Sequence, residues 1–177
     1  MREYYLAENL HKKYATREPY ELLECIGAEV RVNYDFDPGG LKGFATILNR
    51  IKFVVINGNL NEHEQRTVAG HEAAHLILHK TDILNSPAYT LRDFNLFNNS
   101  GRLEYQANSF LADFLLSDEA VLEVIEDGDY FSHASILCVP PPLLAFKLHS
   151  MVRRDYKVKL PVSIESSFLL GSLRKDF

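Results

Sequence analysis

The sequence predicts an α+β fold, in which a small antiparallel three-stranded sheet packs on one long helix and a helical C-terminal part follows. Three observations support this prediction. Three β-rich runs separated by turn residues follow one another, over 29–36, 44–48 and 52–56. A capped segment of helical character comes directly after them and carries the sequence His71-Glu72-Ala73-Ala74-His75. From 102 to 154 the apolar residues recur at helical spacing.

The composition suits one globular domain, or one domain with a small appendage. The 177 residues are 46% hydrophobic and include 11 Phe and 9 Tyr, which is enough for a substantial core. The net charge of −5 and the lack of a large basic block do not favour direct binding to nucleic acid. No apolar run reaches the about 18 residues that a membrane-spanning helix needs, so we expect no membrane partner.

The N-terminus and the cysteines favour a cytoplasmic protein. Residues 1–5 lack the basic-then-apolar layout of a signal peptide. Cys25 and Cys138 lie far apart and in no metal-ligand spacing, so we expect them to be reduced and to pack in the core.

Two helices are predicted at the start of the chain, over 2–15 and 19–26, with Pro19 at the first position of the second. In the first predicted strand, Val30, Val32 and Tyr34 alternate as in a half-buried strand. The third strand contains the continuous apolar run 53–56, which is typical of a central strand.

The helix after the sheet is predicted to begin at Asn61, which forms a capping box with Glu64, and to end near Lys80. Residues 81–101 are polar and irregular, and we expect a long loop that either overhangs the histidines or extends away from the domain.

The remaining pattern is helical. Amphipathic helices are predicted over 102–116 and 118–126, and two short helices around Pro140-Pro141-Pro142 fill 130–154. This last pair is either a helical subdomain packed on the core or a helix-turn-helix. Basic residues near its end are expected to lie on a solvated surface; they are Arg153, Arg154, Lys157 and Lys159. We therefore predict one domain over 1–128, which includes the helix with His71 and His75, and a helical C-terminal subdomain and tail over 129–177.

His71, Glu72 and His75 carry the chemistry. Two histidines four residues apart on a helix lie about 40° apart around its axis and about 6 Å apart along it, so both imidazoles can bind one ion. This H-E-x-x-H spacing is that of zinc peptidases, in which zinc lowers the pKa of a bound water. Glu72 then takes the proton of that water and passes it to the leaving amine.

A catalytic zinc ion usually has three protein ligands. The extended motif H-E-x-x-H-x-x-G-x-x-H is excluded, because Leu78 and Thr81 stand at its Gly and third His positions. His79 lies about 12 Å along the axis from His71, too far to share the ion, and a supporting role behind the ligands or at the helix end suits it better. A carboxylate from a second helix remains, and Glu104, near the start of the helix over 102–116, is the best candidate.

The two segments Gly70–His79 and Glu104–Leu116 together resemble the ImmA/IrrE metallopeptidase family. Its members have H-E-x-x-H with a further His four residues on, followed by a helix of the type E-x-x-A-N-x-F-A-x-x-L-L. The resemblance places His71, His75 and Glu104 at the metal ligands, with one zinc ion per chain, and Glu72 at the catalytic glutamate.

The chain departs from the family pattern away from the ligands. Ala73-Ala74 replace a frequent Leu-Gly, Leu111 stands where Ala is usual, and no Pro follows the second helix. Asn108, one turn after Glu104, is expected either to orient that carboxylate or a neighbouring backbone group, or to pack between helices.

By this resemblance we expect a cytoplasmic zinc-dependent endopeptidase that cleaves a regulatory protein, such as a DNA-binding helix-turn-helix repressor. The alternative is a non-proteolytic zinc-containing module that binds a repressor or DNA, and hydrolysis of a non-peptide amide is a third possibility. The sequence leaves open whether the native metal is Zn²⁺, Mn²⁺ or Fe²⁺. It also leaves open the oligomeric state and the oxyanion-stabilising residue, for which Tyr89, Tyr105 and His133 are candidates.

Overall fold

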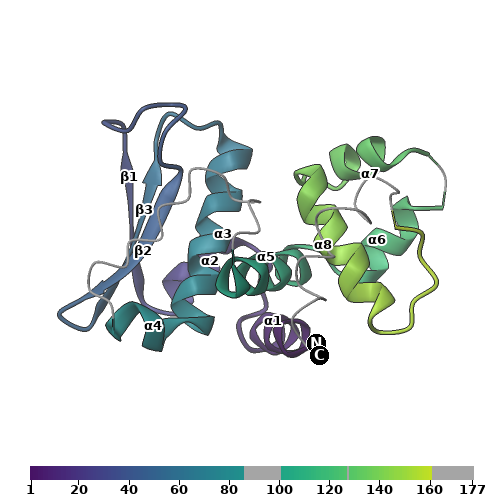
Figure 1. Ribbon diagram of the computed structural model, residues 1–177, viewed down its shortest axis with the longest axis horizontal. Coiled ribbons are helices and arrows are strands. Elements are labelled where there is room, and N and C mark those ends of the chain that lie inside the picture. Colours follow the sequence, from purple (N-terminus) through teal and green to yellow (C-terminus); the bar gives the residue numbers. More distant parts are fainter. Residues whose placement is uncertain (86–100, 127, 161–177) are drawn as a thin grey trace.

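The computed structural model describes residues 1–85, 101–126 and 128–160 and contains a sheet at one end and a group of helices at the other (Figure 1). Its elements in chain order are α1 (Arg2–Tyr14), α2 (Pro19–Cys25), β1 (Ala28–Asn33), β2 (Gly43–Leu48), β3 (Ile51–Asn57), α3 (Glu62–Leu78), α4 (Lys80–Asn85), α5 (Arg102–Leu115), α6 (Asp118–Val124), α7 (Tyr130–Ile136) and α8 (Pro141–Val152). The predicted α+β class with three strands is confirmed.

The sheet is mixed, so the prediction of a wholly antiparallel sheet is wrong for one of its two strand pairs. The strand order is β1-β3-β2, with β3 antiparallel to β2 and parallel to β1. A two-residue turn joins β2 to β3; both its residues, Asn49 and Arg50, have positive φ, as a tight hairpin requires. The longer connection 34–42 carries the chain from the end of β1 to the far edge of the sheet. The apolar strand β3 thereby takes the central position and pairs on both edges.

The first strand is shorter and less buried than its alternation predicts. It ends at Asn33, whose side-chain oxygen accepts a hydrogen bond from the backbone of Asp35 and starts a turn. Val32 and Tyr34 are consequently exposed, and only the first half of β1 packs towards the core.

Helix α3 is the element on which the other layers are built (Figure 1). It packs on β2 and β3 on one side and on α2 and α5 on the other. Its N-terminus has the predicted capping box: Asn61 accepts from the backbone of Glu64 at 3.0 Å, and Glu64 accepts from the backbone of Asn61 at 3.2 Å. Residues 67–76 of this helix are all buried, which is unusual for a helix and reflects contact on every side.

The segment after α3 is not irregular from its start. Residues 80–85 form α4, because Ile83 is buried in the core and the short helix packs against α3 and β2. The rest of the predicted loop, residues 86–100, lies outside the described residues.

The C-terminal helices pack on the rest of the molecule through α8. Pro140 and Pro141 open α8, its buried side chains include Leu143, Leu144 and Met151, and the helix packs on α5. In the described part of the chain no single helix is long and apolar enough to cross a membrane, although α7 and α8, bent by 99° at their junction, pass this test together by length and composition.

Two smaller predictions are wrong. Cys25 and Cys138 are free, as expected, but both are exposed instead of packed in the core. The Arg154 side chain is only 9% exposed because it pairs with Asp118, so it does not belong to a solvated basic surface.

Candidate metal centre

The centre forms where α3 crosses α5. Close approach of the helices depends on Gly70, since a Cβ at this position would overlap the Leu111 side chain and lie 3.2 Å from Pro19 Cγ. One residue later, His71 points from α3 towards α5, and His75 follows one turn further on. Glu104 occupies the first turn of α5 and faces both histidines.

Three ligand atoms converge in this buried space. His71 Nε2 lies 3.1 Å from Glu104 Oε2 and 3.0 Å from His75 Nε2, and His75 Nε2 lies 3.5 Å from Glu104 Oε1. Ligands of a tetrahedral zinc ion with bonds of about 2.0–2.1 Å lie about 3.3 Å apart, which is close to these distances. Both histidines are fully buried and Glu104 is 8% exposed. His71, His75 and Glu104 therefore form a cluster that fits a divalent metal ion.

The protonation states suit a cation. Burial lowers the pKa of His75 to about 4, which keeps the imidazole neutral and able to ligate at neutral pH. Burial acts on Glu104 in the opposite direction, but the adjacent imidazoles of His71 and His75 outweigh it and hold the pKa of this carboxyl well below its usual range. Two neutral imidazoles and one carboxylate carry a net charge of −1, which a divalent cation would balance.

Glu72 lies beside the ligands on α3 and is also fully buried. Its position is near the start of β2, where a Cβ at Gly43 would come within 3.8 Å of Glu72 Cγ. The catalytic glutamate predicted from the motif is thus placed between the histidine-bearing face of α3 and the edge strand of the sheet.

Each histidine ligand has a polar contact on its other ring nitrogen. His71 Nδ1 lies 3.0 Å from Asn108 Oδ1, and His75 Nδ1 lies 2.9 Å from His79 Nδ1. Such contacts behind the ligands fix the tautomer and ring orientation of metal-binding histidines. Asn108 thus contacts His71 across the interface of α3 and α5, a contact that the sequence analysis did not anticipate.

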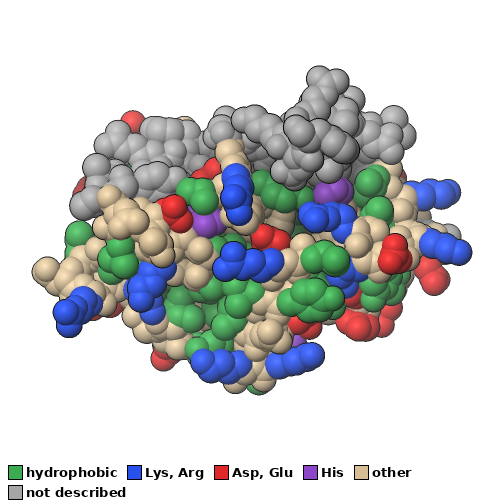
Figure 2. All heavy atoms as spheres, turned by 60° about the horizontal axis from the view of Figure 1, so that its bottom comes forward, with side chains coloured by type: hydrophobic (Ala, Val, Ile, Leu, Met, Phe, Trp, Pro, Cys, Tyr) green, Lys and Arg blue, Asp and Glu red, His purple; other side chains and the backbone are tan. Residues whose placement is uncertain are grey.

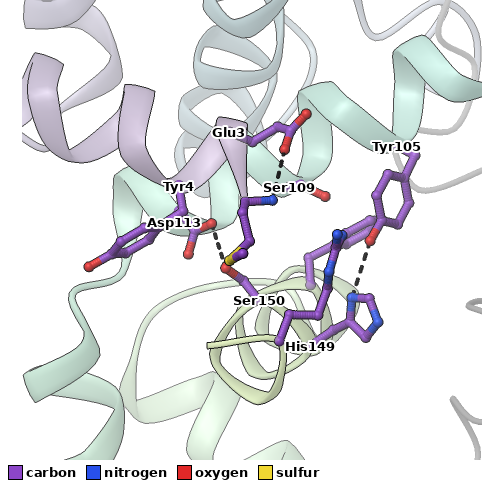
Figure 3. Close-up of a pocket in the computed structure, with 10 residues that line it drawn as sticks. Glu3, Tyr4, Tyr105, Ser109, Asp113, His149 and Ser150 are labelled. Carbon is purple, nitrogen blue, oxygen red and sulfur yellow. Dashed lines mark hydrogen bonds and ion pairs between the residues drawn. The ribbon is translucent and has the colours of Figure 1, made fainter. Parts of the chain in front are cut away.

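Of the candidates for oxyanion stabilisation, the two in the described part of the chain, Tyr105 and His133, lie on different helices, α5 and α7. The Tyr105 hydroxyl lies 3.1 Å from His149 Nδ1 on α8, where it lines a separate pocket (Figure 3). His133 belongs to α7, and Tyr89 lies outside the described residues.

Two residues near the centre were missed by the sequence analysis. Gln106, on α5, contacts His79, and Glu3, on α1, contacts Gln106. No local pattern marks either residue, since the first contact joins positions 27 residues apart and the second joins positions 103 residues apart.

A mixed sheet packed on a helix with H-E-x-x-H, completed by a carboxylate from a second helix, defines a metallopeptidase-like domain. The sequence comparisons agree: the family model of the IrrE N-terminal-like domain, peptidase M78, matches residues 27–159. The chain belongs to this family, which confirms the resemblance seen in its motifs. It is also 34% identical over 117 residues to uncharacterized immunity region protein 2 of Bacillus phage phi105, covering 64% of this chain and 68% of that protein.

Proposed function

We propose that this chain is a zinc-dependent endopeptidase with one zinc ion held by His71, His75 and Glu104. The observation that carries the proposal is the convergence of their three ligand atoms, at 3.0, 3.1 and 3.5 Å, inside a buried crossing of two helices. Zinc bound there would polarise the scissile carbonyl and the attacking water. Glu72 accepts the proton of this water and later donates it to the leaving nitrogen.

The edge strand β2 offers a place for the substrate backbone. It pairs only with β3 in the described part of the sheet, and it starts beside Glu72. A peptide added as a further strand would gain main-chain hydrogen bonds with little dependence on its sequence. Other surfaces of the protein must then select the target, and the helices after residue 128 are candidates for this role.

We further propose a DNA-binding repressor as the substrate, acting in the cytoplasm. Family membership and a relative from a phage immunity region support a role in controlling a repressor. Two features weigh against direct DNA binding by this chain. Most of α8 is buried against α5, and on the face shown in Figure 2 the Lys and Arg side chains are scattered among acidic and apolar ones.

The first test is elemental analysis of the purified protein. Wild type and Glu72→Gln should each contain about one zinc ion per chain, while His75→Ala and Glu104→Ala should lose it or bind it far more weakly. Absence of metal in wild type after addition of zinc and dialysis would overturn the proposal.

The second test separates proteolysis from the alternative, a zinc-containing module that only binds its partner. New protein N-termini are compared between cells expressing wild type and cells expressing Glu72→Gln. We expect a small number of cleavage sites that require Glu72, among them one in a DNA-binding repressor. If Glu72→Gln still changes the activity of the repressor, and no cleavage site that requires Glu72 is found, the non-proteolytic function is correct.

A further inference from the structure

A line of polar side chains leads from the metal centre to the first helix of the protein. His75 Nδ1 lies 2.9 Å from His79 Nδ1, His79 Nε2 lies 3.3 Å from Gln106 Oε1, and Gln106 Nε2 donates to Glu3 Oε1 at 3.2 Å. The line therefore connects α3 through α5 to α1. His79 is 3% exposed and the Glu3 side chain 13%, so water has little access to compete at either position.

The direction of these hydrogen bonds follows from the chemistry of the last residue. Burial raises the pKa of Glu3, but a backbone hydrogen bond and the nearby Met1 amine, 3.4 Å from Oε2, outweigh it and lower the pKa below its ordinary value (Figure 3). An ionised carboxylate can only accept hydrogen bonds. Gln106 must therefore turn its NH₂ group to Glu3, which leaves its oxygen facing His79.

The donor and the acceptor in each remaining hydrogen bond of the line are then determined. Because the Gln106 oxygen can only accept, His79 must donate from Nε2, and a neutral imidazole that donates from Nε2 accepts at Nδ1. His75 must consequently donate its Nδ1 proton to His79. A neutral His75 with its proton on Nδ1 has a lone pair on Nε2, and Nε2 is the atom that faces His71 and Glu104.

We propose that Glu3 and Gln106 are positioning residues, which act through His79 to hold His75 in the tautomer that can bind the metal. This inference rests on the proposed metal site and goes beyond it, since it makes α1 part of the support of the centre. Glu3 lies outside residues 27–159, the part of the chain that matches the family model. Helix α1 packs directly on α5, so the contact is built into the fold.

The opposite polarity shows why the charge of Glu3 matters. If Gln106 presented its NH₂ group to His79, His79 would accept at Nε2 and donate from Nδ1. His75 would then accept at Nδ1 and carry its proton on Nε2, where a metal ion must bind. A side chain at position 3 that accepts and donates equally well would allow both arrangements. The apparent metal affinity would then be reduced to the fraction of molecules in which His75 Nε2 is unprotonated.

The test compares Glu3→Gln with Glu8→Gln, a matched change on the same helix. Glu8 pairs with Arg17 at 2.7 Å, and its side chain is 20% exposed. Zinc affinity is measured by competition with a chelator, and the melting temperature is measured on the metal-free proteins. We expect Glu3→Gln to bind zinc about 2-fold more weakly than wild type, because about half of its molecules then hold His75 in the wrong tautomer. Glu8→Gln should bind zinc as wild type does, and the melting temperatures should be similar.

The tautomer itself is read from ¹⁵N spectra of the histidine rings in the metal-free proteins. Wild type should show His75 protonated at Nδ1 and His79 at Nε2, and Glu3→Gln should show mixed signals for both. Gln106→Met, which removes the amide at similar volume, should weaken zinc binding at least as much as Glu3→Gln.

The outcomes are distinguishable from those of the proposed function. If wild type binds no zinc, the metal site itself is wrong. If wild type binds zinc while Glu3→Gln matches it in both affinity and ring spectra, the metal site stands and the positioning role of Glu3 is overturned.

Discussion

The contacts behind the two histidines of the proposed zinc site, His71 and His75, involve different numbers of residues. Asn108 supports His71 from the same helix that supplies Glu104, whereas His75 depends on a line of residues that ends on α1. Side chains behind the ligands of a metal site typically change its affinity by about 10- to 100-fold. Because a single residue, Asn108, supports His71, we expect its removal to have the larger effect on metal affinity.

We therefore expect Asn108→Ala to weaken zinc binding by about 10- to 100-fold, because His71 loses the acceptor at its Nδ1 proton. Asn108→Asp keeps an oxygen in that position and should bind zinc within a few-fold of wild type. Chelator competition measures both variants. Equal affinity of Asn108→Ala and wild type would show that the 3.0 Å contact does not orient the ring.

At the residue scale, local spacing predicted the site residues on α3 but not the residues of other helices that contact them. His71, Glu72 and His75 are recognisable because helix geometry alone brings positions four apart to one face. Glu104 could be ranked only by elimination and then by resemblance to a family, since its approach depends on how two helices cross. Gln106 and Glu3 were out of reach, because nothing in either local sequence indicates that α1 packs on α5.

The helix that carries the motif depends on its N-terminal cap. Asn61 Oδ1 accepts a hydrogen bond from the backbone N–H of Glu64, one of the N–H groups that have no partner inside the helix. Replacing an Asn cap by Ala costs about 0.5–2 kcal/mol of stability. We expect Asn61→Ala to lower the melting temperature by about 1–8 °C, since 1 kcal/mol corresponds to about 2–4 °C in a chain of this size.

Asn61→Ser is the control, because a serine hydroxyl can accept the same hydrogen bond and should retain most of the stability. Thermal unfolding followed by circular dichroism measures both variants. A loss in Asn61→Ser as large as that in Asn61→Ala would show that the side-chain hydrogen bond is not the source of the effect.

At the element scale, the sequence predicted what each segment is better than how segments pair. The turn residues between the second and third β-rich runs predicted antiparallel neighbours, and the apolar run 53–56 predicted a central strand; both are found. The parallel partner β1 was not predictable, because alternation along one strand contains no information about the direction of its neighbour. Helix α4 was missed because Ile83 is its only buried residue, so its sequence has no apolar periodicity that would predict a helix.

On the scale of the whole molecule, a buried ion cluster joins the C-terminal helices to the rest. Lys147 on α8 is fully buried and lies 3.1 Å from Asp113 on α5 and 2.8 Å from Asp118 on α6. Arg154, after α8, also pairs with Asp118 and stacks 3.6 Å from the ring centre of Tyr4 on α1. The cluster thus crosses residue 128, the boundary at which we predict two parts of the chain to divide.

Removing the lysine should be costly, because it takes the nearest cation from the buried Asp113 carboxylate, while Asp118 keeps Arg154. Breaking a buried ion pair in this way typically costs about 3–5 kcal/mol. We expect Lys147→Met to lower the free energy of unfolding by about that amount in urea titrations. The control is Lys157→Met, at an exposed position, which should change it by less than about 0.5 kcal/mol.

The deficit of Lys147→Met should also depend on pH. Burial already raises the pKa of Asp113 above its ordinary value, against the pull of Lys147 and Ser150, and loss of Lys147 raises it further. A carboxyl with a raised pKa in the folded state costs stability once it ionises, so the deficit should be largest above that pKa and should shrink as the pH falls through it. Urea titrations from pH 7 to pH 4 measure this trend. A deficit that stays constant over the range would show that lost packing of the lysine stem, and not an unpaired charge, destabilises the variant.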